Sequence, residues 1–222
     1  MDFTFSEFIQ QLWIARGSIA YGLGVTMAIA ASAIVLGTVL GIGVGLALTY
    51  GGRPLRWLAR GYTDFLRGTP VLVLVLAGYY VPSAVGIGLS PLQAGVLALA
   101  VFCSSHVGEI VRGALQAIPK GQMDAAKAIG LTFRQTFASV LMPLALRQVL
   151  PAWVNTAAEI VKASTLLSVI GVGDLLLASQ EIIARTFMNL PFYFLAGFLY
   201  FSINFSIERF GRFVERKTTI PS

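Results

Sequence analysis

The chain has 222 residues, of which 56% are hydrophobic and only 12% are charged, and its mean hydropathy is +0.79. Soluble domains carry roughly 25% charged residues. No Asp, Glu, Lys or Arg lies between Arg16 and Arg53, or between Arg67 and Glu109. Each gap is long enough for at least one transmembrane helix of about 20 apolar residues. This pattern excludes a soluble globular protein, a disordered chain and a nucleic-acid-binding protein, although the net charge is +6.

The cysteine and histidine content excludes other classes. Cys103 is the only cysteine, so the chain cannot form an internal disulfide, and it has no Cys/His cluster for zinc. His106 and Glu109 have the spacing of some metal ligands, but no second such pair occurs, so we expect no metal site. The first residues (MDFTFSE) are acidic and lack the basic start of a signal peptide, so we expect no cleavage.

Hydropathy and helix-breaking residues predict five membrane spans. They cover 18–50, 70–80 (extendable to 85), 92–115, a stretch within 150–172, and 191–210. Thr69 is expected to cap the second span, with Pro70 at its first helical position. Gly37, Gly41 and Gly45 recur every four residues, which lines one face of the first span with small residues and allows another helix to approach closely.

The basic residues predict the orientation of these spans, because Lys and Arg concentrate in cytoplasmic segments. One side of the expected membrane carries the basic residues of the first loop, the third loop and the tail: Arg53, Arg56, Arg60 and Arg67, then Lys120, Lys127, Arg134 and Arg147, then Arg209, Arg212, Arg216 and Lys217. The opposite side carries only Arg16 and Arg185. The N-terminus is therefore expected outside and the C-terminus in the cytoplasm.

The predicted organisation has three parts. Residues 1–16 form a periplasmic, interfacial segment, in which 3–14 are expected to be a short amphipathic helix on the outer surface. Residues 17–216 form one transmembrane domain, and residues 217–222 form a cytoplasmic tail.

The polar segment 116–147 is the most informative part of the sequence. Residues 122–129 predict a short helix, which Gly130 can end in the left-handed conformation. Thr132 and Gln135 have the spacing of a capping box that opens the next helix. The short helix has one small apolar face, formed by Ala125, Ala126 and Ile129. This face is too small to anchor the helix in lipid, but it is suited to a groove on another protein.

Residues 121–131 (GQMDAAKAIGL) resemble the EAA loop of ABC importer permeases, with Asp124 in place of the usual Glu. Pro143, twelve residues after Leu131, also matches. Other segments resemble the polar amino acid permease subfamily, so that the resemblance extends over 17–216. These segments are 67–70 (RGTP), 109–114 (EIVRGA), 118–122 (IPKGQ), 150–155 (LPAWVN), Lys162 with 164–166 (STL), and 169–172 (VIGV).

The resemblance implies the all-α, five-helix fold of type I (MetI-like) ABC importers in a bacterial cytoplasmic (inner) membrane, with an EAA loop at about 119–143. It implies that ATPase coupling involves Gly121, Gln122, Asp124, Ala125, Ala126 and Gly130. The implied partners are a second permease subunit, identical or related, two ATPase subunits and an extracytoplasmic amino acid-binding protein. ATP and Mg²⁺ belong to the ATPases. This chain has no GxxxxGK[ST] loop, so it is expected to bind no cofactor and to catalyse no reaction.

Polar side chains at bilayer depth are costly and usually face a pathway or a partner. The candidate substrate-pathway residues are His106, Asn155, Glu159, Lys162, Ser164 and Thr165. Glu159 and Lys162 lie three residues apart, so they can pair with each other. Alternatively, Glu159 contacts a substrate ammonium or guanidinium group, or the two residues make contacts across the subunit interface. Asn155, Ser164 and Thr165 can bond either to substrate or to their own helix backbone.

Glu109 and Arg112 are expected to form a structural ion pair near the cytoplasmic interface.

The sequence departs from the family pattern at three positions in the spans. Ala163 replaces an acidic residue, His106 replaces a Tyr, and Glu159 stands where a neutral residue is more common. These departures suggest that a site for a cationic ligand has moved by one helical turn.

The sequence therefore predicts the membrane subunit of an ATP-driven, binding-protein-dependent importer for polar or charged amino acids. An ABC permease for another small solute, such as an opine, is the alternative that keeps the same machinery. A secondary transporter or channel is less well supported, because no inverted repeat is evident and the EAA helix would have no role. A membrane-embedded enzyme lacks a nucleophile–base or metal constellation.

Overall fold

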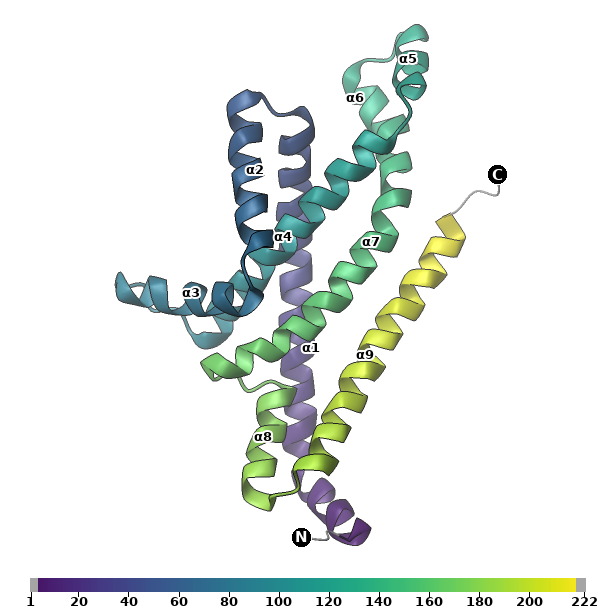
Figure 1. The fold of residues 1–222 in the computed structure, drawn as a ribbon. Helices are drawn as coiled ribbons and strands as arrows, with labels where there is room; N and C mark the ends of the chain where they lie inside the picture. The colour runs from purple at the N-terminus through teal and green to yellow at the C-terminus, as the bar shows by residue number, and fades with distance from the viewer. Residues whose placement is uncertain (1–3, 219–222) are drawn as a thin grey trace.

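The computed structural model describes residues 4–218, and the regular secondary structure in this range is helical throughout (Figure 1). The elements are α1 (Phe5–Tyr50), α2 (Arg53–Gly68), α3 (Val71–Ala84), α4 (Pro91–Ala117), α5 (Lys120–Ala128), α6 (Phe133–Thr136), the π turn η1 (Phe137–Leu141), α7 (Met142–Ala163), the 3₁₀ segment η2 (Ser164–Ile170), α8 (Leu175–Thr186) and α9 (Asn189–Thr218). The expected all-α architecture is confirmed. Residues 1–3 and 219–222, parts of the expected outer segment and tail, lie outside the described range.

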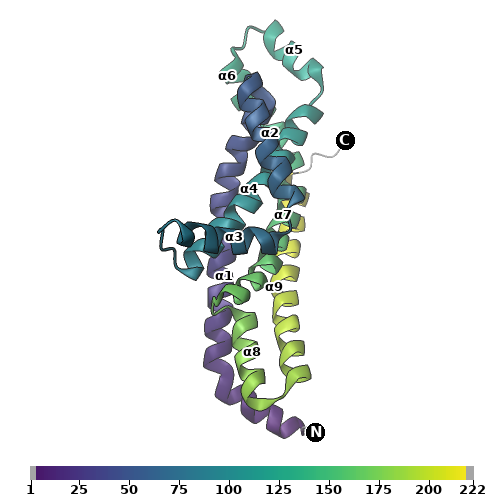
Figure 2. The same ribbon diagram turned by 60° about the vertical axis from the view of Figure 1, so that its left-hand side comes forward.

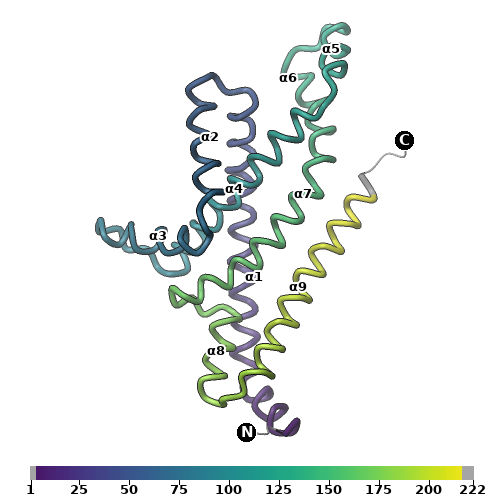
Figure 3. The backbone as a smooth tube through the Cα atoms, viewed as in Figure 1, coloured from purple at the N-terminus to yellow at the C-terminus, as the bar shows by residue number. Residues whose placement is uncertain are grey.

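Four segments of the described chain are long and apolar enough to cross a membrane: α1, α4, the run Phe133–Ile170 and α9. Helices α2 and α3 pass the same test only as a pair, which is bent by 109°. Four of the five expected spans thus coincide with these long segments, and the second, over 70–80, coincides with α3, which passes the test only together with α2. Figures 1 and 3 show α2 running beside α1, whereas α3 projects sideways, away from α1.

The arginine-rich segment after the first span, expected as a loop, is helix α2. Its inner face buries Ala59, Thr63 and Leu66. Thr69 does not cap α3 as expected; it ends α2, and its hydroxyl donates to the Phe65 carbonyl at 2.7 Å. Pro70 ends α2 because it disfavours helical geometry in the residue before it, and Pro70, rather than Thr69, is the N-cap residue of α3.

The expected surface helix over 3–14 is not a separate element, because its described residues form the first turns of α1. Thr4 and Glu7 form a capping box at the helix start. Figure 1 shows these turns tilted toward the base of α9. The ring of Phe8 packs edge-on against Phe192 of α9, with centroids 5.5 Å apart. Contact with α9, rather than an independent interfacial position, therefore fixes this segment.

The fourth span, expected within 150–172, belongs to a helical run that is more than a dozen residues longer at its N-terminal end. The helical run begins at Phe133, directly after the predicted capping box, in which Thr132 and Gln135 accept each other's backbone N–H. Pro143 does not break it, because the π turn η1 precedes this residue and already interrupts the regular hydrogen-bond pattern. The last helix also extends past the expected Phe210, to Thr218.

Helices α1 and α4 are in close contact along the predicted glycine face. A Cβ built on Gly37 would lie 2.5 Å from the Cys103 Cβ, and one on Gly41 would lie 2.6 Å from the Val107 Cβ. Real Cβ atoms do not approach this closely, so these positions require glycine. The predicted close approach of a second helix is therefore confirmed, and its partner is α4.

A second core joins the N-terminal half of α1 to α8 and α9 (Figure 2). Asp174 is fully buried at its edge; its Oδ1 accepts the Leu177 N–H at 2.9 Å, and its Oδ2 accepts the Tyr200 hydroxyl at 3.3 Å. The Thr26 hydroxyl accepts the Leu175 N–H at 3.1 Å. Burial raises the pKa of Asp174 to about 6, while the hydrogen bond from Leu177 opposes this rise. These bonds fix the start of α8 against both long helices.

The glycine contact predicts the effect of substitution. We expect Gly41→Ala to destabilise the protein by about 1–3 kcal/mol, because the added methyl group overpacks the α1–α4 contact. Gly43, two residues away, has nothing within 4 Å of an added Cβ, so Gly43→Ala serves as the matched control. Thermal unfolding of the detergent-solubilised protein measures both. Equal melting temperatures for the two variants would contradict this account of the contact.

Candidate functional site

Helices α5 and α6 form a short hairpin at the end of the molecule opposite the N-terminus (Figure 2). The chain turns at Gly130, which has φ +80°, as predicted. The Leu131 N–H donates to the Ala126 carbonyl at 3.0 Å, and the Gly130 N–H donates to the Lys127 carbonyl at 2.9 Å. This pair of bonds is the Schellman motif. The turn therefore depends on a residue that adopts positive φ without strain.

The hairpin exposes most of the expected coupling residues. Gly121, Gln122, Asp124, Ala125 and Gly130 are all exposed. Ala126 is buried, so it lies beneath the hairpin rather than on its outer surface. The small apolar face expected from the sequence is therefore divided. Its exposed part is Ala125 and Ile129, and the Ile129 side chain is 76% exposed.

Three of the expected pathway residues lie on one exposed face of α7. Asn155, Glu159 and Lys162 follow a spacing of four and three residues, and all three are exposed. No ion pair joins Glu159 to Lys162 in the described part of the chain. Both charges are therefore available to another molecule.

The other three expected pathway residues bond to their own helices. The buried Ser164 hydroxyl donates to the Val161 carbonyl at 2.8 Å, and the Thr165 hydroxyl donates to the Lys162 carbonyl at 2.7 Å. The His106 Nδ1 lies 3.1 Å from the Phe102 carbonyl oxygen. The structure thus gives each of these three side chains a hydrogen-bond partner on its own helix, and only Ser164 among them is buried.

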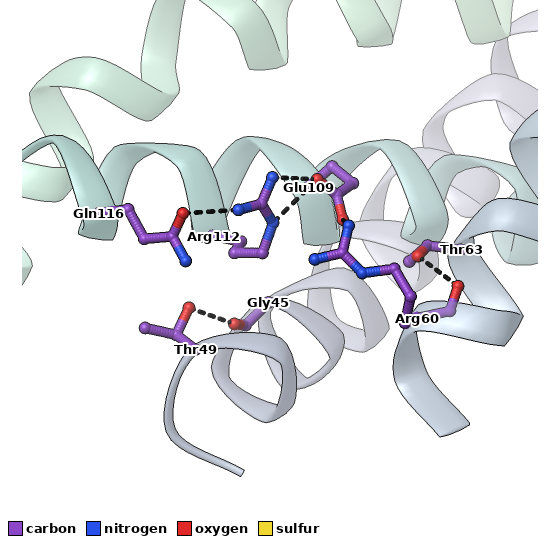
Figure 4. Close-up of polar contacts among 7 residues, drawn as sticks. All are labelled: Gly45, Thr49, Arg60, Thr63, Glu109, Arg112 and Gln116. Carbon is purple, nitrogen blue, oxygen red and sulfur yellow. Dashed lines mark hydrogen bonds and ion pairs between the residues drawn. The ribbon is translucent and has the colours of Figure 1, made fainter. Parts of the chain in front are cut away.

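An ion network joins α4 to α2 (Figure 4). The Glu109 Oε2 accepts bonds from the Arg112 Nε at 2.9 Å and Nη2 at 2.6 Å, while the Arg112 Nη1 donates to Gln116 at 2.6 Å. Glu109 is also 3.7 Å from the Arg60 Nη1 on α2. This Glu109 Oε1 atom is buried and has no hydrogen bond within the described residues. Arg60 is thus its compensating charge.

Sequence reasoning missed Arg60 in this network. It also missed the hydrogen bond of 2.6 Å between the Tyr62 and Ser104 hydroxyls, which fixes α2 to α4 one helical turn away. Partners about 40 residues or more apart in the chain give no local signal. In the described range, no group of three or more His, Cys, Asp or Glu side chains is close enough to hold a metal ion, and His106 and Glu109 form no such group.

Residues 33–220 match the family described as "Binding-protein-dependent transport system inner membrane component". The chain belongs to this family. The arginine transport system permease protein ArtQ of Bacillus subtilis is 32% identical over 218 residues, which are 98% of each chain. The glutamine transport system permease protein GlnP of Escherichia coli is 32% identical over 211 residues, 94% of this chain and 96% of that one.

A solved structure agrees with this assignment. An amino acid ABC transporter with histidines superimposes with a TM-score of 0.89, at 28% identity, and covers 98% of this chain and 100% of that one. The resemblance to ABC importer permeases, on which the sequence prediction depended, is therefore confirmed over nearly the whole chain. The type I importer fold is confirmed with it.

The ion network of this permease predicts a coupled pair of mutational effects. We expect Arg60→Gln to lower stability by about 1 kcal/mol or less, because Arg60 is half exposed while Glu109 is largely buried. In a protein that already carries Glu109→Gln, we expect Arg60→Gln to cause no further loss of stability.

Arg56→Gln is the matched control for this cycle, because Arg56 lies on the same helix but donates to the Thr49 and Gly51 carbonyls instead. Its effect should be the same with and without Glu109. For each arginine, thermal unfolding of the wild type, the two single variants and the double variant with Glu109→Gln measures the coupling. If the effects of Arg60→Gln and Glu109→Gln are additive, the network does not join α2 to α4.

Proposed function

We propose that this chain is the transmembrane subunit of an ATP-driven, binding-protein-dependent importer for polar or charged amino acids. The observation that carries the proposal is the exposed charged face of α7, which lies within an otherwise apolar span. The kinship with permeases of amino acid transport systems supports the same substrate class.

The α5–α6 hairpin is the proposed contact with the ATPase subunits, which bind ATP and Mg²⁺. In this proposal the hairpin lies on the cytoplasmic side and the N-terminus lies outside, in agreement with the distribution of the basic residues. Its exposed surface combines a carboxylate, Asp124, with the apolar side chains of Ala125 and Ile129. Such a rigid two-helix projection can dock into a groove and transmit its movement to α4 and α7, which flank it in the chain.

The exposed face of α7 is the proposed wall of the substrate pathway, which a second permease subunit, identical or related, completes. Glu159 and Lys162 carry opposite charges, about one helical turn apart, and do not pair with each other. An amino acid zwitterion has the complementary charges. In this arrangement Glu159 accepts hydrogen bonds from the substrate ammonium group, Lys162 donates to its carboxylate, and Asn155 offers a neutral amide beside them. An opine, which also carries amino and carboxylate groups, is the second candidate for the same face.

The turn at Gly130 tests the coupling role. Gly130→Ala forces a Cβ into positive φ, at about 1–2 kcal/mol, and should displace the hairpin without changing insertion into the membrane. We expect the variant to lose uptake and to lose the ATPase that co-purifies with the wild-type protein in mild detergent.

Gly113→Ala is the control for this experiment, because Gly113 on α4 also has open space around it and does not have positive φ. It should keep both uptake and the co-purifying ATPase. Failure of the wild-type protein to retain any ATPase with a phosphate-binding loop would overturn the coupling proposal.

The substrate role of Glu159 is tested by Glu159→Gln in reconstituted vesicles. Losing a hydrogen bond to a charged group costs about 1.5–3 kcal/mol, so uptake at saturating binding protein should fall about tenfold or more. Glu181→Gln removes an exposed carboxylate from α8 instead and should leave uptake unchanged. Unaltered rate and selectivity in Glu159→Gln would exclude Glu159 from the substrate site.

A further inference from the structure

A groove of about 300 Å³ lies where α1, α4 and α7 diverge, on the side of the molecule that carries the α5–α6 hairpin. Its floor is formed by the buried residues Val107, Val111 and Ala145, from α4 and α7. Its rim is formed by Ile42 of α1 and Leu146 of α7, which are each about half exposed. The groove is therefore open along one side.

The walls of the groove are almost entirely apolar. Besides Thr38 and Trp153, only aliphatic, Met and Phe side chains line it. The Trp153 Nε1 donates to the Thr38 Oγ1 at 2.8 Å, so the indole N–H is already satisfied within the protein. The groove thus offers a polar amino acid nothing to compensate its lost hydration. Its chemistry fits a hydrocarbon chain.

The position of the groove on α7 shows which environment it faces. Leu146, Leu150 and Trp153 line the groove. The polar residues of the same helix, Asn155, Glu159 and Lys162, each follow one of these by nine residues. Nine residues are about two and a half turns of an α-helix, so the polar and apolar sets lie on opposite sides of α7.

Charged groups in a membrane span face water or protein rather than lipid. On the proposed function, the side of α7 that carries Glu159 and Lys162 is covered by the pathway and the second permease subunit. The groove, on the opposite side, then faces away from both. Beside Ile42 at the rim, α1 also exposes the apolar side chains of Val35 and Val39. We expect this apolar surface to face the hydrocarbon of the membrane.

We propose that an acyl chain of a membrane phospholipid occupies this groove. The chain lies against Val107, Val111 and Ala145, between the walls that α1 and α7 provide. The aromatic ring of Phe137, in the π turn η1, closes the groove at the hairpin end. This end of the site is directly before α7, so a bound chain contacts the helix that leads from the hairpin to the pathway.

Photolabelling of the complete transporter in lipid vesicles tests this site. The probe is a phosphatidylethanolamine with a diazirine on one acyl chain, and labelled peptides are mapped by mass spectrometry. We expect labelling within 142–150 of α7, as well as at Val35 and Val39, which serve as internal controls for general contact with lipid. The readout does not require transport, so it is independent of the proposed substrate and ATPase roles.

Two variants fill the groove from opposite walls. Ala145→Phe occupies its floor, and Ile42→Phe narrows its mouth at an exposed position that tolerates substitution more readily. Each new ring displaces at least two methylene groups of the chain, so labelling within 142–150 should fall about tenfold. Labelling at Val35 and Val39 should not change.

Two outcomes would overturn the proposal. Absence of wild-type labelling within 142–150, with Val35 and Val39 labelled, would mean that another protein surface covers the groove. Labelling within 142–150 that persists in both variants would mean that the chain touches only the rim.

Discussion

The close contact between α1 and α4 is the constraint on which the rest of this structure depends. Helix α1 is about 69 Å long at 1.5 Å per residue, more than twice the hydrocarbon thickness it has to cross. It packs against α4 through Gly37, Gly41 and Gly45. On α4, Gly108 contributes to the same contact, because an added Cβ there would lie 2.7 Å from Val44. In lipid, where the hydrophobic effect does not drive helices together, such packing of small residues does so. Because α2, α3 and α7 all pack on α4, the α1–α4 contact positions the candidate site as a whole.

The sequence predicted those elements whose signals are local. The glycine period in α1, the capping box at Thr132 and the left-handed turn at Gly130 each depend on residues within one or two turns, and all three are confirmed. Helix α2 was missed because its arginines were interpreted as a loop. Its helical state depends on burying Ala59, Thr63 and Leu66 against its neighbours, a tertiary effect that hydropathy alone does not contain.

In the candidate site, too, the sequence predicted the local contacts and missed the long-range ones. The Glu109–Arg112 contact spans three residues on one helix, and the structure contains it. Its extension to Arg60, like the bond between Thr38 and Trp153, joins residues far apart in the sequence. The pairing of Glu159 with Lys162, one of the alternatives that the sequence left open, is absent from the described residues although its spacing is also local. A spacing of three residues permits a salt bridge but does not enforce one, because exposed pairs gain little over solvation.

The α4 ion network and the α5–α6 hairpin are directly connected in the chain. Glu109, Arg112 and Gln116 stiffen the last two turns of α4, and only Ile118 and Pro119 separate that helix from α5. Through Arg60, the same network holds α2, which ends at the 109° bend before α3. The bend is where the chain leaves this charged, hydrogen-bonded region for the apolar α3. Residues 69–70 are therefore the break between the part of the chain that the network holds on α4 and the separate helix α3, because Pro70 prevents helical continuity there.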